Sequence, residues 1–134
     1  MKQTMMMIGT SLLVAACGGS KADGQVDTAH KVDTTSAEFR EARVLSRMKM
    51  DLLNLVTTEE TYFNDHMKYT ANVKSLAGGL GFLTPGNTIS PITLVGGGWT
   101  ATIQNPNTRQ VCAIFVGTKT PIPPATKEGV PACR

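Results

Sequence analysis

The chain has 134 residues, of which 41% are hydrophobic and 17% charged, and its formal net charge at pH 7 is +3. This length suits one small folded domain and excludes a large multidomain enzyme. A net charge this small does not by itself indicate a nucleic-acid or membrane partner.

Residues 1–16 have the pattern of a secretory signal peptide. Lys2 gives a positive start, and Met5 to Ala16 is an apolar run without charge. The run is too short to cross a bilayer, and it ends in small residues as cleavage sites do. Val14-Ala15-Ala16-Cys17 resembles a bacterial lipobox, the motif whose cysteine is lipidated after cleavage.

The lipobox resemblance implies that residues 1–16 are removed and that Cys17 carries acyl chains such as palmitate. The alternative is an ordinary signal peptide that contains a thiol. Each buried methylene contributes about 0.8 kcal/mol, so two or more chains anchor a protein stably. We therefore expect an exported protein, lipid-anchored to the cell envelope. Gly18 rather than Asp follows the cysteine, which resembles sorting to the outer membrane if the host has two membranes.

Residues 17–34 are predicted to form a flexible polar linker from Cys17. Gly18 to Thr34 contains almost no apolar side chain, so it cannot bury a core of its own. As a flexible chain it would span roughly 20–25 Å on average. His30 is most simply a solvated residue of this linker. The folded domain is then expected over residues 35–134.

A helix is predicted from Thr35 or Ser36 to near His66. Thr35-x-x-Glu38 is a capping-box pattern. Apolar residues then recur at spacings of three, four and seven, as on one helix face: Leu45, Met48, Leu52, Leu55, Val56 and Phe63. The pattern gives a helix of about 30 residues and roughly 45 Å. We expect its first turns to project beyond the core and to present an apolar, partner-binding stretch: Phe39, Val44 and Leu45.

The second half of the chain is predicted to be an antiparallel sheet. After a loop over 68–86, Thr88 to Leu94 indicates one strand interrupted by Pro91. Trp99 to Gln104 alternates cleanly, and Gln110 to Val116 is apolar on both faces, which indicates the most buried strand. The fold class is therefore α+β, with a long amphipathic helix packed on three to four antiparallel strands.

Cys112 and Cys133 are left as a pair once Cys17 is assigned to lipid. In an exported protein such a pair favours a disulfide, worth about 3 kcal/mol in the chain-entropy model. Two free thiols or half of a metal site are the alternatives, but no Cys-x-x-Cys occurs, and His30 and His66 are distant in sequence. The tail from Pro121 is expected to have no regular structure and to be held by this disulfide.

Motifs of catalysis are scarce. Glu59 and Glu60 are adjacent and so point about 100° apart on a helix. His66 beside Asp65 could act as a base, but a histidine at a helix C-terminus is also favoured by the helix dipole. No nucleophile elbow, zinc-protease motif or P-loop occurs in the sequence. We predict no enzyme activity, no cofactor or metal, and no small-molecule substrate.

The chain contains no acidic residue between His66 and Lys127. Basic residues of this segment are candidates for a polyanion-binding surface: Lys68, Lys74, Arg109 and Lys119. The alternative is a mildly basic surface without a ligand, because the residues are dispersed rather than clustered. Trp99 is expected to pack against the helix.

The order of the elements resembles the headgroup of type IV pilins and pseudopilins. Five segments carry the likeness, together with Tyr69-Thr70: Asp51 to Leu55, Glu59 to Phe63, Gly98 to Ala101, Cys112 to Gly117 and Glu128 to Cys133. The match covers roughly 45–134. The prepilin peptidase site and the hydrophobic helix of pilins are replaced here by a lipobox and a polar linker. The resemblance implies a pilin-like head held on a membrane by lipid.

Two functions are compatible with this organisation. The first is a non-enzymatic envelope lipoprotein that binds other proteins, such as components of a type IV pilus or type II secretion system. The second is a surface lipoprotein that binds DNA or another polyanion through its basic head. Weakening of binding by salt would favour the second.

Overall fold

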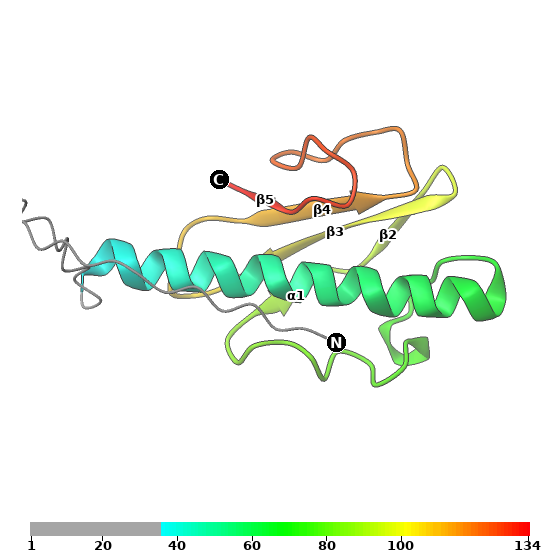
Figure 1. The fold of residues 1–134 in the computed structure, drawn as a ribbon, viewed down its shortest axis with the longest axis horizontal. Helices are drawn as coiled ribbons and strands as arrows, with labels where there is room; N and C mark the ends of the chain where they lie inside the picture. Colours follow the sequence, from blue (N-terminus) through cyan, green and yellow to red (C-terminus); the bar gives the residue numbers. More distant parts are fainter. Residues whose placement is uncertain (1–35) are drawn as a thin grey trace, which may run out of the picture. The chain divides into compact units, whose positions relative to one another are not determined.

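One long helix and an antiparallel sheet make up residues 36–134, the part of the chain described by the computed structural model (Figure 1). The α+β class predicted from the sequence is confirmed. The predicted signal peptide, the lipidation site Cys17, Gly18 and the linker over 17–34 lie outside the described residues.

Helix α1 runs from Ala37 to His66 and has 30 residues, which confirms its predicted extent. Ser36 is the N-cap, and its hydroxyl oxygen accepts a hydrogen bond from Phe39 N at 3.1 Å. Such a bond satisfies one of the free N–H groups of a first helical turn. The helix ends where Met67 adopts the left-handed conformation and donates its N–H to Phe63 O.

The sheet contains five short strands rather than three or four. They are β1 (Thr88–Ile89), β2 (Thr93–Val95), β3 (Gly98–Gln104), β4 (Cys112–Val116) and β5 (Ala132–Cys133). The order is β1-β3-β4-β5, all antiparallel, and β2 also pairs with β3. The helix crosses one face of this sheet and contacts β3 and β4 (Figure 1).

Two expectations for the strands were wrong. The predicted single strand around Pro91 is two strands, β1 and β2, which pair with opposite ends of β3. Proline lacks the N–H that a continuous ladder would need there. The C-terminal tail is not wholly irregular, because β5 pairs with β4 beside the Cys112–Cys133 disulfide.

The hairpin between β2 and β3 depends on glycine. Gly96 and Gly97 have φ values of 56° and 90°, as a two-residue turn of type I′ requires. At Gly98 a Cβ atom would overlap the carbonyl oxygen of Val116 on β4. The three consecutive glycines thus form a tight turn and allow β3 to approach β4 closely.

The main core lies between α1 and the sheet. Met48, Leu52 and Leu55 of the helix are fully buried in one cluster with Trp99 and Ile103 of β3. This burial of Trp99 confirms its predicted packing against the helix. Side chains of the connecting loop complete the cluster: Val73, Leu76, Leu80 and Phe82. The loop also contains a short 3-10 helix, Val73–Ser75.

The other face of β4 is covered by the C-terminal segment. Ala113 and Phe115 are buried there with Ala125, and Ile122 and Ala132 pack against them. All five residues of β4 are buried, as its apolar sequence predicted. The tail therefore forms a second layer, which is why this strand has apolar residues on both faces.

Candidate functional site

Three adjoining depressions form a groove where α1 begins. The largest encloses about 660 Å³ between the helix and the turn that joins β3 to β4. A second, of about 520 Å³, shares Thr108 and Arg109 with it, and a third, of about 130 Å³, shares Arg40 and Val44. Arg40 and Arg109 line the largest depression, whereas Arg43 and Arg47 line only the third, which is formed by side chains of α1 alone. We call this surface the arginine groove.

The helix supplies one wall of the arginine groove. Arg40, Arg43 and Arg47 are spaced three and four residues apart, so they lie along one side of α1. All three are exposed, whereas Val44 between them is half-buried and packs against the core. The wall is thus an apolar base with guanidinium groups above it.

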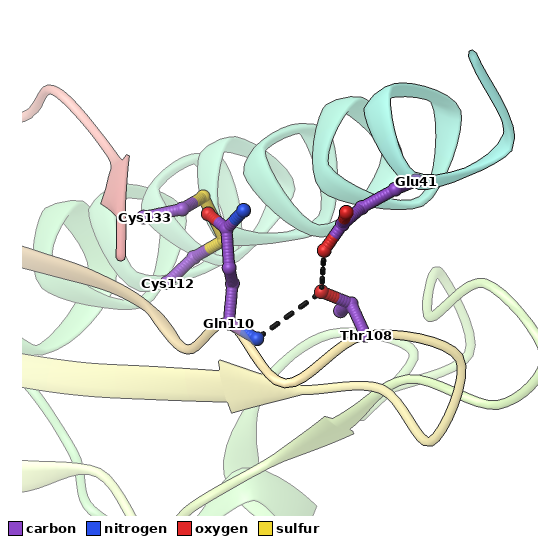
Figure 2. The surroundings of a disulfide bond; sticks show 5 residues. All are labelled: Glu41, Thr108, Gln110, Cys112 and Cys133. Carbon is purple, nitrogen blue, oxygen red and sulfur yellow. Dashed lines mark hydrogen bonds between the residues drawn. A yellow bond between two sulfur atoms is a disulfide. The ribbon is translucent and has the colours of Figure 1, made fainter. Parts of the chain in front are cut away.

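The turn after β3 supplies the other wall and is bonded to the helix. Thr108 Oγ1 donates a hydrogen bond of 2.6 Å to Glu41 Oε1, across 67 residues of sequence (Figure 2). The same hydroxyl oxygen accepts a bond of 3.1 Å from Gln110 N. The carboxylate of Glu41, which lines the groove, is therefore already engaged, and Arg109 follows Thr108 directly.

A buried polar chain holds this turn from behind. Asp51 on α1 accepts bonds from Thr84 N at 2.9 Å, Thr84 Oγ1 at 3.2 Å and Asn87 Nδ2 at 2.6 Å. Asn105 Nδ2 donates to Asn87 Oδ1 at 2.6 Å, and Asn105 Oδ1 accepts from Asn107 N at 2.9 Å. Buried hydrogen-bond networks of this kind fix one geometry when their members are satisfied. The turn carrying Arg109 is therefore fixed relative to α1.

The disulfide reinforces the same end of the sheet. Cys112 and Cys133 are bonded, which confirms the predicted pairing, and they face each other in the register of β4 and β5 (Figure 2). Next to them, Val111 and Arg134 exchange two backbone hydrogen bonds, of 2.9 and 3.2 Å. The chain leaving the β3–β4 turn is thus tied to the C-terminus.

The chemistry of the arginine groove suits an anionic group. A guanidinium presents a planar set of donors that matches carboxylate and phosphate oxygens, often in pairs. Here such groups approach from two elements, with Arg40 on α1 and Arg109 on the turn. Sequence reasoning proposed Arg109 but missed the helix arginines, although their spacing of three and four was readable.

The proposed polyanion residues do not converge on one surface. Arg109 precedes β4 and Lys119 follows it, so the length of the strand, about 17 Å, separates them. Lys68 lies beyond the end of α1 and lines a separate depression of about 370 Å³ with Met67, Leu94 and the glycines of the β2–β3 turn. Lys74 is in the 3-10 helix of the loop.

The proposed apolar stretch on the early helix is not open surface. Phe39, Val44 and Leu45 are each half-buried, and Val44 and Leu45 pack against the main core. The helix reaches the sheet earlier than expected, because the β3–β4 turn extends beside its first turns. The large apolar side chains that α1 does expose are Met50 and Leu53.

A second buried acid lies near the other end of α1. Glu59 is fully buried, and its Oε2 accepts a hydrogen bond of 3.1 Å from Thr70 N. Among residues 36–134, Glu59 Oε1 and Trp99 Nε1 are the buried side-chain atoms without a hydrogen-bond partner. Burial raises the pKa of Glu59, opposed by the bond from Thr70 and assisted by the charge of Glu60.

The remaining polar contacts of this end are structural in character. Tyr69 donates a hydrogen bond of 2.8 Å to Glu60 Oε1, and burial together with this bond raises the pKa of Tyr69 to about 12. His66 is exposed, stacks on Tyr62 at 4.0 Å, and has Nδ1 at 3.0 Å from Tyr62 O. Within residues 36–134 no group of three or more His, Cys, Asp or Glu side chains could hold a metal, and no helix is long and apolar enough to span a membrane.

No protein-family model matches the chain, and searches of curated proteins and of solved structures found no match. The resemblance to pilin headgroups therefore stays a prediction from the sequence.

Proposed function

We propose that this chain is a lipid-anchored, non-enzymatic envelope protein whose pilin-like head binds another envelope protein. The observation that carries the proposal is the arginine groove, where Arg40 and Arg109 meet from α1 and the β3–β4 turn. The ligand is an acidic segment of the partner, whose carboxylates pair with these guanidinium groups.

The construction of the groove supports a binding role. The wall carrying Arg109 is bonded to α1 through Thr108, and the buried chain from Asp51 lies behind it. A surface that is ordered before its partner arrives loses less conformational entropy on binding. Arg109 is exposed, which leaves it accessible to a second protein.

The class of partner follows from the pilin-like order of elements. A long helix, an antiparallel meander and a disulfide-closed end resemble headgroups that assemble with components of type IV pili and type II secretion systems. The lipid on Cys17 would hold such a head at the membrane as an accessory of this machinery.

Binding of DNA or another polyanion is the second candidate. The arginine groove favours it too, because guanidinium groups bind phosphates as well as carboxylates. Phosphate contacts release counterions, so binding to DNA would weaken steeply with salt. Lys68 and Lys119 lie at the far end of the sheet from Arg109, so a single groove-sized ligand would not contact all of them.

The anchor is tested by fractionation. The wild-type chain should incorporate labelled palmitate and sediment with membranes, and Cys17→Ser should abolish the labelling. Absence of label on the wild-type chain would refute lipidation.

The groove is tested by crosslinking in cells. A photo-crosslinking residue in place of Ala37, which lines the groove, should capture a protein through a segment rich in Asp and Glu. Arg109→Glu should abolish this capture, whereas the matched reversal Lys127→Glu, in the C-terminal segment, should leave it intact. Equal capture by the two variants would refute the assignment of the groove. Loss of capture on adding DNA would instead favour the second candidate.

A further inference from the structure

The outward face of α1 combines basic and apolar side chains. Arg43, Arg47, Met50 and Leu53 are spaced four, three and three residues apart, so they follow one line along the helix. All four are exposed, with Met50 at 57% and Leu53 at 40%. Met50 and Leu53 are the two large apolar side chains that α1 exposes, and they lie next to its exposed arginines.

The charges beside this line have one sign. From Phe39 to Thr58 the exposed charged residues are all basic: Arg40, Arg43, Arg47 and Lys49. The two acids of the same stretch, Glu41 and Asp51, are hydrogen-bonded to other elements. Glu41 is half-buried and bonded to Thr108, and Asp51 is 2% exposed and bonded to the connecting loop.

The sheet lies on the opposite side of the helix. Met48, Leu52 and Leu55 face the core, and α1 contacts β3 and β4 (Figure 1). The line from Arg43 to Leu53 therefore points away from the sheet. A flat surface could contact it along about 15 Å of helix, at 1.5 Å per residue.

We propose that this outward face lies on an anionic phospholipid surface, with Arg43, Arg47 and Lys49 at the lipid phosphates and Met50 and Leu53 in the headgroup region. Helices with basic and apolar side chains on one surface bind membranes in this way. The inference rests on the proposed function in one respect, since the lipid on Cys17 is what brings the head to the membrane.

The tether favours a lipid surface over a second protein. Two exposed apolar side chains and a few cations are too small a contact for a stable protein interface, which buries about 1,200 Å² or more. A membrane-tethered domain needs far less affinity, because a short linker keeps the effective concentration of the surface near the millimolar range. The predicted linker over 17–34 is of this kind.

The test measures vesicle binding without the lipid anchor. Full-length chain carrying Cys17→Ser is floated with vesicles of phosphatidylcholine alone or mixed with phosphatidylglycerol. We expect binding to the mixed vesicles, weakened roughly tenfold or more by Arg43→Glu with Arg47→Glu. The control reverses two charges elsewhere, Lys119→Glu with Lys127→Glu, and should bind as the parent does. The apolar run before Cys17 can itself bind vesicles and is present in every variant. The test therefore compares binding between variants rather than the binding of any one of them.

A neutral variant separates charge from apolar contact. Met50→Ser with Leu53→Ser should weaken binding to the mixed vesicles at high salt, where electrostatic attraction is screened. Both residues are exposed on the helix, so the thermal midpoint should change little and report that the fold is retained.

Two results would overturn the proposal: equal binding by the two charge-reversed variants, or equal binding at high salt by the parent and the Met50→Ser, Leu53→Ser variant. Either result leaves palmitate labelling and groove crosslinking untouched, so a failure here is distinguishable from a failure of the proposed function. Conversely, lack of label on Cys17 removes the anchor without affecting the vesicle result.

Discussion

Each half of α1 buries one acidic side chain, and the two carboxylates accept different numbers of hydrogen bonds. Asp51, 2% exposed, receives three hydrogen bonds from Thr84 and Asn87. Glu59, 0% exposed, receives one from Thr70 and has an unpartnered oxygen. Burying a carboxylate costs free energy unless hydrogen-bond donors face it. The number of donors around each acid, rather than its burial, therefore decides whether it stabilises the fold.

The regions around Asp51 and Glu59 also differ in how well they suit a binding surface. Around Asp51 the helix, the loop and the β3–β4 turn are joined by polar bonds, and the arginine groove opens beside them. Around Glu59 the hydrogen bonds join α1 only to the residues that follow it, such as Tyr69 and Thr70, and two aromatic pairs lie beside them. A binding surface benefits from the first arrangement, because its geometry is fixed in advance.

The largest expected loss of stability comes from replacing Asp51, the acid that accepts more hydrogen bonds. Asp51→Ala should lower the free energy of unfolding by about 4 kcal/mol, because it leaves buried donors of Thr84 and Asn87 without an acceptor. Chemical denaturation measures this loss. Asp51→Asn, which keeps the shape and one acceptor, should cost less. A loss below about 1 kcal/mol for the alanine variant would contradict the role given to the polar chain.

Removing the Cys112–Cys133 disulfide tests the stability of the sheet beside the β3–β4 turn. Cys133→Ser should lower the free energy of unfolding by about 3 kcal/mol, because it releases a loop with a sequence separation of 21. The thermal midpoint of the wild-type chain should fall equally on adding reductant. Identical midpoints with and without reductant would show that the bond adds no stability.

Glu59→Gln, unlike the two variants above, should raise stability at neutral pH. The raised pKa of Glu59 means that the folded chain prefers the protonated acid, so its contribution to stability is present below pH about 4.5 and is lost as pH rises through the folded pKa. The amide keeps the acceptor for Thr70 without a charge. The variant should therefore match the wild type in acid and exceed it at neutral pH, as thermal midpoints across pH will show. A variant less stable at neutral pH would contradict this.

The smallest effect concerns the titration of Tyr69, which donates a hydrogen bond to Glu60. Its phenol should titrate near pH 12 in a spectrophotometric titration, above the ordinary value of 10.0. Glu60→Gln removes a charge that disfavours the phenolate, so the pKa should fall toward that ordinary value. An unchanged titration in the variant would assign the shift to burial alone.

Sequence patterns were sufficient where the determining signal is local. Apolar spacing along α1 predicted both its extent and its buried face, including Met48, Leu52 and Leu55. Alternation predicted β3, and the pairing of the two remaining cysteines predicted the disulfide. The same reasoning failed at Pro91, where it kept one strand instead of two, and at the tail, where it missed β5.

The candidate site was largely invisible in the sequence. Arg109 was identified as a basic residue of an acid-free segment, but it was grouped with Lys68, Lys74 and Lys119, which lie elsewhere in the fold. Phe39, Val44 and Leu45 were expected on open surface and are half-buried. Both errors have one cause, since sequence spacing does not say which loop packs beside which helical turn.

The sequence by itself determined the α+β class, the long helix, the disulfide and the expectation of a lipid anchor, because periodicity, caps and short motifs act between near neighbours. Only the tertiary structure decided that Glu41 meets Thr108 across 67 residues and that Asp51 is satisfied while Glu59 is not. It also decided that Arg40 and Arg109 line one depression. These relations depend on how the helix packs on the sheet, and that packing is set by the whole core at once.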